Sequence, residues 1–577
     1  MTRTRRTRAA AGATLAALAL AACNPLGDPT SSPTTTALGG PEQQLTVLSQ
    51  GPVLAWDPQR ITSRQQALFA GRTYMRTLTT YAAATDLGGQ KKLVGDLATG
   101  LGEPSKDRTS WTFTLRTGIT WQDGTPVTCS DVRHGVARSF AKETGAAGYA
   151  LTYLDIPKNP DGTSKYPGPY GTKGQSAAAK KLIEHAVGCK GRTVTFRLSE
   201  PVADFPAIAS LPELAPVKAP KDKRDDSIYL AWSNGPYKLQ KAWRPGEGGT
   251  WVRNEEWDPD SDPVRTPTLR QIVHREGVDA VEAVRLITEG KDGSRAVLLD
   301  PLPQGLLGPV SESSDQVLTV ASEGQIVDYL APNHASKVLR DADVRTALAL
   351  ATDREAYAHA LGGEGMATPT WSLLGAALPS AHSPVLDRGP TGDVEEAKAL
   401  LAKAKQPTPT IRVAYRAGAP TDQAMAALEA GWEKAGFVVE LKPVDEDYFT
   451  TISAPEAKGD YDVFWANWGA DYPSASTVLP FLFDSRSNLS ASSAGRDYGY
   501  VKDDRLNKAM DAALRTGSDE KRAQAWVEVD TTLLERASYI PLAHHRSTFV
   551  AGTDVTDLSA NAVFGGAVEL GTIGVTR

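Results

Sequence analysis

Residues 111–132 read WTFTLRTGITWQDGTPVTCSDV, and this stretch decides the fold class of the first half of the chain. Its first six residues alternate between apolar and polar side chains, which is the pattern of a strand with one buried face. The Asp123–Gly124 pair predicts a tight turn, because glycine adopts the positive φ that such turns require. A helix is expected over 131–140, with Thr128 or Ser130 as its N-cap. Strands joined by turns and followed by a helix predict a mixed α and β body.

The second half of the chain alternates strand and helix patterns. A strand over 411–415, a helix over 421–435 and a strand over 438–443 predict a right-handed βαβ unit on a parallel sheet. A strongly apolar strand is expected over 461–468. Three further segments are expected to be regular, namely helices over 63–81 and 344–360 and a final short strand over 539–543. The chain as a whole therefore reads as α/β.

Length and charge narrow the class of protein. A single hydrophobic core stops growing at about 250–300 residues, so a chain of 577 residues is expected to form two or more domains. The net charge is −6 and the pI is near 5.9, with no basic block beyond the N-terminus. This balance argues against nucleic acid as a partner.

Two cysteines remain in the body of the chain, Cys129 and Cys189. In an oxidising compartment, an even number of cysteines suggests one disulfide bond between them. Two unpaired, buried thiols are the alternative.

The N-terminus has the pattern of an export signal. A basic start is followed by the apolar stretch 9–22, which is too short for a membrane-spanning helix of about 20 residues. Leu20–Cys23 resembles the lipobox of bacterial lipoproteins, and this resemblance implies a cleaved signal over 1–22, a lipid on Cys23 and anchoring to the cell membrane. An ordinary secretory signal is the alternative. Residues 23–44 are rich in Pro, Ser, Thr and Gly, so they are expected to be a flexible linker.

Five segments, in order along the chain, resemble the extracellular solute-binding lipoproteins of ABC importers for peptides, nickel and related solutes. They are residues 93–98 with 111–132, 233–239 with Arg253–Asn254 and Trp257, 343–354, 395–401, and 461–473. Cys129 and Ser474–Ala475 depart from the residues usual in that class.

The resemblance implies an α/β fold with two lobes that close on a ligand, as in periplasmic binding proteins. It implies a first lobe over 45–328, with an extra β-rich subdomain at about 57–192, a second lobe over 329–540, and a return to the first lobe over 541–577. The implied function is that of a monomeric, lipid-anchored substrate-binding component. It would capture oligopeptides and deliver them to a membrane permease, without catalysis, cofactor or metal.

Asp471 is the first candidate for ligand binding. A carboxylate at the end of a buried strand suits the capture of a cationic group. In peptide-binding members of the class, the aspartate at the matching position pairs with the α-ammonium group of the ligand, so the resemblance implies this role for Asp471. An aspartate that caps the turn before Pro473 is the alternative.

Further candidates surround the same strand end or lie in the second similar segment. They are Trp465, Asn467, Trp468, Gly469, Tyr472, Asn234 and Tyr237. Because side chains alternate along a strand, Trp465 and Asn467 share one face and Trp468 lies on the other. The strand backbone itself is expected to pair with an extended peptide. No basic residue could be nominated for the ligand carboxylate.

Competing functions remain open at this point. The same scaffold could bind a metal chelate, haem or an oligosaccharide, or the chain could be a surface lipoprotein or hydrolase without a transporter. The motifs of a serine hydrolase, a zinc protease and a phosphate-binding loop are absent from the sequence. His544–His545 is a poor metal site, because neighbours on a strand point to opposite faces.

Overall fold

The computed structural model describes residues 43–144, 148–290, 293–375, 377–378, 389–445, 447–491 and 493–576. The chain divides into two compact units, residues 1–40 and residues 41–577, and all described residues belong to the second unit. Cys23, the signal over 1–22 and nearly all of the linker lie outside the described residues. Gln44, the last residue of the predicted linker, already belongs to strand β1.

A mixed sheet of eleven described strands forms the centre of the second unit. Its order is β15-β14-β16-β12-β17-β11-β1-β10-β9-β8, with β13 paired to β17. The strands are β1 (Gln44–Leu48), β8 (Tyr237–Leu239), β9 (Gly248–Arg253), β10 (Gln271–Arg275), β11 (Ala296–Leu298), β12 (Val317–Pro332), β13 (Ala367–Pro369), β14 (Thr410–Arg416), β15 (Val438–Val444), β16 (Val463–Gly469) and β17 (Ile540–Gly552).

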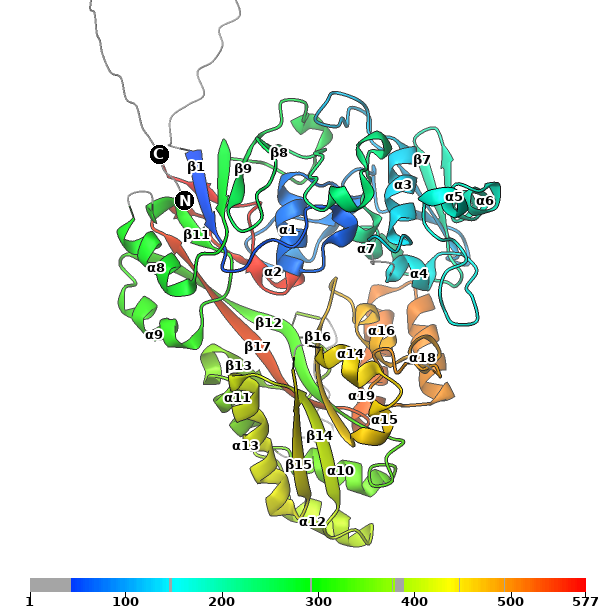
Figure 1. Cartoon of the computed structure of the whole chain (residues 1–577), viewed down its shortest axis with the longest axis vertical. Coiled ribbons are helices and arrows are strands. Elements are labelled where there is room, and N and C mark those ends of the chain that lie inside the picture. The colour runs from blue at the N-terminus through cyan, green and yellow to red at the C-terminus, as the bar shows by residue number, and fades with distance from the viewer. Residues whose placement is uncertain are drawn as a thin grey trace, which may run out of the picture. The chain divides into compact units, whose positions relative to one another are not determined.

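Two long strands, β12 and β17, connect the two ends of this sheet. They run antiparallel side by side, with register shifts at Glu323/Val327 and Asp328/Tyr329 (Figure 1). The prediction of a final short strand over 539–543 is wrong. The strand β17 continues to Gly552 because β12 offers a partner along this length. Four short strands follow, β18 (Val555–Thr556), β19 (Ala560–Asn561), β20 (Ala567–Val568) and β21 (Gly574–Val575).

The quoted stretch 111–132 forms the strand, turn and helix that it predicts. Strand β5 (Ser110–Thr114) belongs to a sheet of order β4-β5-β7-β6, with β4 (Glu103–Pro104), β6 (Val187–Lys190) and β7 (Thr193–Arg197). Gly124 has a φ of 76° in the turn. Helix α3 (Cys129–Ser139) follows, and Thr128 is its N-cap in a capping box with Asp131.

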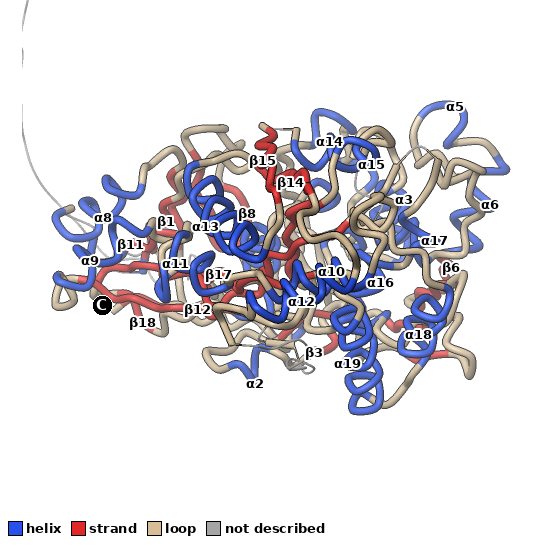
Figure 2. The backbone as a smooth tube through the Cα atoms, turned by 90° about the horizontal axis from the view of Figure 1, so that it is seen from below, coloured by secondary structure: helices blue, strands red, loops and turns tan. Residues whose placement is uncertain are grey.

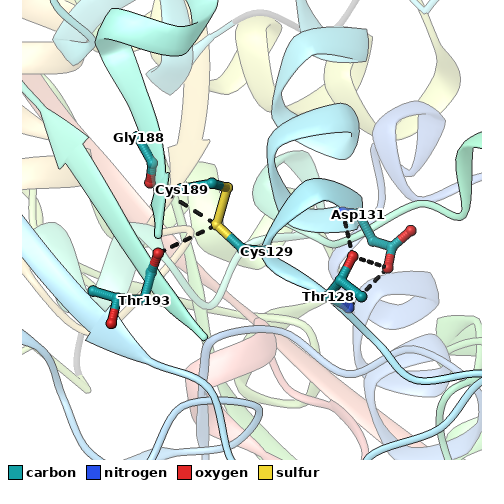
Figure 3. Close-up of a disulfide and its surroundings, with 6 residues drawn as sticks. All are labelled: Thr128, Cys129, Asp131, Gly188, Cys189 and Thr193. Atoms are coloured by element: carbon teal, nitrogen blue, oxygen red, sulfur yellow. Dashed lines mark hydrogen bonds between the residues drawn. A yellow bond between two sulfur atoms is a disulfide. The ribbon is translucent and has the colours of Figure 1, made fainter. Parts of the chain in front are cut away.

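In the structure, a disulfide joins Cys129 to Cys189, which ties the first residue of α3 to strand β6 (Figure 3).

The predicted βαβ unit is present. Strands β14 and β15 are parallel, and helix α13 (Ala419–Ala435) connects them. The helices α10 (Ala342–Leu350), α11 (Arg354–Ala360), α12 (Val394–Lys403) and α13 lie beside these strands (Figure 2). The prediction of one helix over 344–360 is wrong, because the side chain of Asp353 caps a second helix by accepting a hydrogen bond from the Ala356 amide.

The prediction of a helix over 63–81 is also wrong at its C-terminal end. Helix α1 (Arg64–Thr73) ends before Tyr74, and the chain then forms β2 (Thr79–Tyr81), which pairs with β3 (Leu93–Gly95). Pairing with a later strand therefore overrides the local helical pattern.

The remaining helices are short or lie outside the sheet. They are α2 (Leu87–Gln90), α4 (Tyr149–Tyr153), α5 (Gly171–Gly174), α6 (Ala177–Ala186), α7 (Phe205–Ile208), α8 (Ala280–Glu289), α9 (Gln304–Glu312), α14 (Tyr448–Ser453), α15 (Ala457–Asp460), α16 (Leu479–Phe483), α17 (Ser485–Asn488), α18 (Asp504–Arg515) and α19 (Asp519–Glu535). In the part of the chain that the structure describes, no helix has the length and apolar character needed to span a membrane.

The buried apolar residues form separate clusters. The largest runs from Tyr329 to Ala543 and is called here the 329–543 core. Three other clusters are built mostly from residues before 320 and after 548. The C-terminal segment thus returns to pack with the N-terminal half.

Candidate functional site

The carboxyl end of β16 opens on a cavity of about 280 Å³, which is close to the smaller ligand pockets of proteins. Segments far apart in the sequence line it, chiefly 58–81, 148–149 and 210–213, together with Asp471 and Arg496. The polar side chains of the lining that matter for the chemistry are those of Arg64, Arg72, Tyr149, Glu213, Asp471 and Arg496.

Three side chains donate hydrogen bonds to the Asp471 carboxylate. Tyr149 donates its hydroxyl hydrogen to Oδ2 at 2.6 Å, and Thr477 donates to the same oxygen at 3.2 Å. Arg64 donates from Nη2 to Oδ1 at 3.2 Å, and this ion pair is only partly buried. Asp471 is therefore held in one position by residues from three parts of the chain.

Arg64 binds the strand end beyond this ion pair. Its Nε donates to the Ala470 carbonyl at 2.9 Å, and its Nη2 also donates to the Gly469 carbonyl. The second arginine of this segment, Arg72, is bound to the buried carboxylate of Glu569 at 2.8 Å, so its charge is already balanced.

Two groups beside Asp471 have shifted pKa values. Burial, followed by the charge of Asp471, raises the pKa of the Tyr149 hydroxyl, so Tyr149 stays a hydrogen-bond donor. Burial raises the pKa of Glu213 to about 7, although the amides of Tyr149 and Ala150 donate to its carboxyl group. The cavity lining therefore carries a carboxyl group whose pKa lies near neutral pH.

Arg496 supplies an uncompensated positive charge to the cavity. Its guanidinium lies 4.2 Å from the ring centre of Phe481 and 5.8 Å from that of Trp468. Among the described carboxylates, none forms an ion pair with it, and the residue is exposed. A guanidinium that stacks on aromatic rings keeps its hydrogen-bond donors free for an anion.

The two predicted tryptophans of β16 lie on opposite faces of the strand, as the alternation of side chains along a strand indicates. Trp468 faces Arg496 and donates its indole N–H to the Thr477 carbonyl at 3.0 Å. Trp465 lies in the 329–543 core and donates to the Tyr357 hydroxyl at 2.9 Å.

The other predicted residues at the strand end have mixed surroundings. Asn467 is half-buried, and Gly469 lies against Arg64. Tyr472 is buried, its ring packs against Tyr149, and its hydroxyl contacts Ser476 at 3.1 Å.

Asn234 and Tyr237 lie apart from this site. Asn234 accepts a hydrogen bond from the Arg76 amide at 2.8 Å, and Tyr237 donates to the Leu269 carbonyl at 2.8 Å. Both side chains are buried, and neither is among the described residues that line the cavity. Their hydrogen bonds link separate segments of the N-terminal half.

One edge of β16 is partly open. Strand β14 pairs with β16 only at Val463 and Phe464, whereas β12 pairs with it along its whole length. No described strand pairs with the remaining edge, 465–469, on the β14 side. Backbone groups on such an edge can pair with an extended peptide.

Sequence reasoning missed Arg64, Tyr149, Glu213 and Arg496. Each lies in a segment with no motif of its own, and only the fold brings them to Asp471. In the described ranges, no group of His, Cys, Asp and Glu side chains is arranged to hold a metal ion.

Comparison with known sequences identifies relatives along most of the chain. The model of the family "Bacterial extracellular solute-binding proteins, family 5 Middle" matches residues 92–490. The chain is 24% identical over 479 residues to "Probable D,D-dipeptide-binding periplasmic protein DdpA" of Escherichia coli (strain K12), which covers 79% of this chain and 80% of that protein. It is 25% identical over 464 residues to "Periplasmic oligopeptide-binding protein OppA" of Salmonella typhimurium, which covers 76% of this chain and 77% of that protein.

Solved structures agree with this result. "Clavulanic acid biosynthesis oligopeptide binding protein 2" superposes with a TM-score of 0.82 at 26% identity, which covers 92% of this chain and 95% of the other. The match confirms the predicted two-lobed α/β fold class.

Proposed function

Because the chain belongs to the bacterial extracellular solute-binding proteins of family 5, we propose that it captures short peptides between its two lobes and delivers them to the permease of an ABC importer. Members of this family bind substrates and are not enzymes. The observation that carries the proposal is the position of Asp471, at the open end of β16 and on a cavity of about 280 Å³.

The cationic end of the peptide binds at Asp471. An α-ammonium group has three N–H donors, and the strand end offers the Asp471 carboxylate with the carbonyls of Gly469 and Ala470. Tyr149 and Thr477 fix the carboxylate before the ligand arrives, so little entropy is lost on binding.

An anionic group of the peptide binds at Arg496. This residue lines the same cavity and has no ionic partner among the described carboxylates. The carbonyls of Trp465 and Gly469 on the edge 465–469 of β16 already accept hydrogen bonds from Tyr448 and Arg64. The remaining backbone groups on the side not paired with a strand supply donors and acceptors that do not discriminate between side chains. These features together suit a zwitterionic ligand with a peptide backbone.

Closure occurs around β12 and β17. The proposed lobes, 45–328 with 541–577 and 329–540, are supported by the separate hydrophobic cores and by the two strands that run between them. A ligand shifts the equilibrium toward the closed form only by its preference for that form.

Anchoring and transport complete the proposal. The sequence Leu20–Cys23 supports a lipid on Cys23, and residues 24–42 supply a spacer rich in Pro, Ser and Thr. A receptor held in this way stays near the permease at the membrane surface. We expect it to act as a monomer.

A thermal-shift screen of the full chain tests the ligand class. Tri-alanine and tetra-alanine are compared with nickel, haemin and maltotriose. A ligand at about a hundred times its Kd stabilises the folded state by about 2.7 kcal/mol, so the peptides should raise the Tm. A rise with the sugar, the metal or haemin, and none with either peptide, would contradict the proposal.

A further inference from the structure

Arg64 occupies the oxygen atoms that a ligand ammonium group would need. Its guanidinium binds three consecutive residues at the end of β16, namely the carbonyls of Gly469 and Ala470 and the carboxylate of Asp471. A ligand ammonium group that binds the same oxygens would lie directly against the guanidinium of Arg64, which has the same charge, so the two cations compete for this set of acceptors.

Two glycines, Gly469 and Gly565, leave space for the Arg64 side chain. A Cβ atom at Gly469 would lie 3.0 Å from Nη1 of Arg64, and a Cβ atom at Gly565 would lie 3.1 Å from its Cδ. Contacts this short require one of the partners to shift, so glycine at both positions suits the arginine in its observed place. Arg64 is itself the first residue of α1, whose N-cap Ser63 fixes the start of the helix.

The contact also joins two different cores. Phe69 and Ala70 of α1 belong to the cluster that contains Leu45 and Trp251, whereas Phe464 and Ala466 of β16 belong to the 329–543 core. An Arg64–Asp471 pair therefore holds the two parts together without any ligand.

We infer that Arg64 is an internal cation which occupies the ammonium subsite of the empty protein and must leave before a ligand ammonium binds Asp471. This inference rests on the proposed function. Ligand binding then exchanges one cation for another at Asp471. Arg64 therefore lowers the protein's affinity for peptides with a free N-terminus, because the ligand ammonium group must displace the guanidinium. The released guanidinium remains at the cavity, where it joins Arg496.

The test is isothermal titration calorimetry of the full chain and of Arg64→Met with tri-alanine and N-acetyl-tri-alanine. Methionine keeps the length of the side chain and its helix propensity but removes the competing charge. Tri-alanine should bind about fivefold more tightly to Arg64→Met, which corresponds to the loss of one partly exposed ion pair. The affinity for N-acetyl-tri-alanine should change much less.

The matched control is Arg285→Met, which removes an arginine from an exposed helical ion pair with Glu282 and lies outside the cavity. It should leave both affinities unchanged. An equal or weaker affinity of Arg64→Met for tri-alanine would overturn the inference.

A second measurement separates this inference from the ligand class. If neither protein binds any peptide, the proposed function fails, and a double-mutant cycle of Arg64→Met and Asp471→Asn in urea unfolding decides the role of Arg64. Coupling between the two substitutions in the ligand-free chain supports the internal cation. Additive effects contradict it.

Discussion

At the scale of single residues, the proposed binding site contains charged side chains that differ in how completely they are paired. Asp471 has three intramolecular donors, and Arg72 is neutralised by Glu569. Among the residues that the structure describes, the guanidinium of Arg496 contacts the aromatic rings of Trp468 and Phe481 and forms no ion pair. An unpaired charge at a cavity gains the most binding free energy from a ligand group of opposite sign. We therefore expect the anionic end of the ligand to bind at Arg496.

Replacement of Arg496 should therefore affect one end of the peptide only. We expect Arg496→Gln to weaken the binding of tri-alanine about tenfold, since hydrogen bonds to charged groups contribute about 1.5–3 kcal/mol. Binding of C-terminally amidated tri-alanine should change little. Calorimetry on both peptides measures this, with Arg285→Gln as the control. Equal losses for the acid and the amide would show that Arg496 does not read the carboxylate.

At the scale of elements, the disulfide fixes the start of α3 against strand β6. The bond closes a loop of 60 residues, and the chain-entropy account gives such a loop about 4 kcal/mol. Cys129→Ala with Cys189→Ala should lower the free energy of unfolding by about this amount, measured in urea. Peptide affinity should not change, because neither cysteine lines the cavity.

Chemical reduction of the unsubstituted chain provides the control and should reproduce the loss of stability. An unchanged free energy of unfolding after either treatment would mean that the bond does not brace this region.

Elements were predictable from sequence where local pattern and tertiary partners agree. The βαβ unit over 411–443 and a helix that starts near residue 130 follow from periodicity and cap residues, and the structure selects Thr128 rather than Ser130 as the N-cap. The segment 344–360 keeps an alanine-rich helical pattern, yet Asp353 starts a new helix within it. The length of β17 could not be read locally, because it depends on β12, more than 200 residues earlier.

The residues of the candidate binding site were likewise predictable only where local sequence was sufficient. The position of Asp471 at a strand end was predictable, because the carboxylate follows its own strand in sequence. Arg64 was not, since 407 residues separate it from Asp471 and no local signal distinguishes it from other helix-start residues. Arg496 and Glu213 were missed for the same reason.

At the scale of the whole molecule, buried carboxyl groups govern how stability depends on pH. Burial raises the pKa of Glu213 and Asp497 to about 7 and that of Asp530 to about 6. The folded protein therefore retains protons that the unfolded chain releases near pH 4. The stabilisation that these groups contribute is fully present when the pH is below their pKa in the unfolded chain. It is lost as the pH rises through their pKa in the folded protein.

At low pH, a carboxyl group with a lowered pKa makes the stability depend on pH in the opposite direction. Asp262 lies between Arg265 and Arg76, and these charges outweigh its burial and lower its pKa to about 2. Its stabilising effect is present above the unfolded pKa and is lost as the pH falls through the folded pKa. The three raised carboxyls and Asp262 together predict that stability is highest near about pH 4 and falls on either side.

Urea unfolding across the pH range tests this expectation. Between about pH 5.5 and about pH 8 the free energy of unfolding should fall by about 5 kcal/mol. Asp530→Asn should reduce this fall, because its amide does not titrate. A free energy of unfolding that rises over the same interval would contradict the assignment of neutral, buried carboxyls.

The central claim is that Asp471 binds the α-ammonium group of a peptide held between the lobes. Calorimetric titration of the full chain and of Asp471→Asn with tri-alanine and N-acetyl-tri-alanine tests it most directly, with the exposed loop variant Asp161→Asn as control. The unsubstituted chain and the control should bind the free peptide about tenfold more tightly than the acetylated one, and Asp471→Asn should remove the difference. Equal affinity of the unsubstituted chain for the two peptides, or an unchanged preference in Asp471→Asn, would contradict the claim.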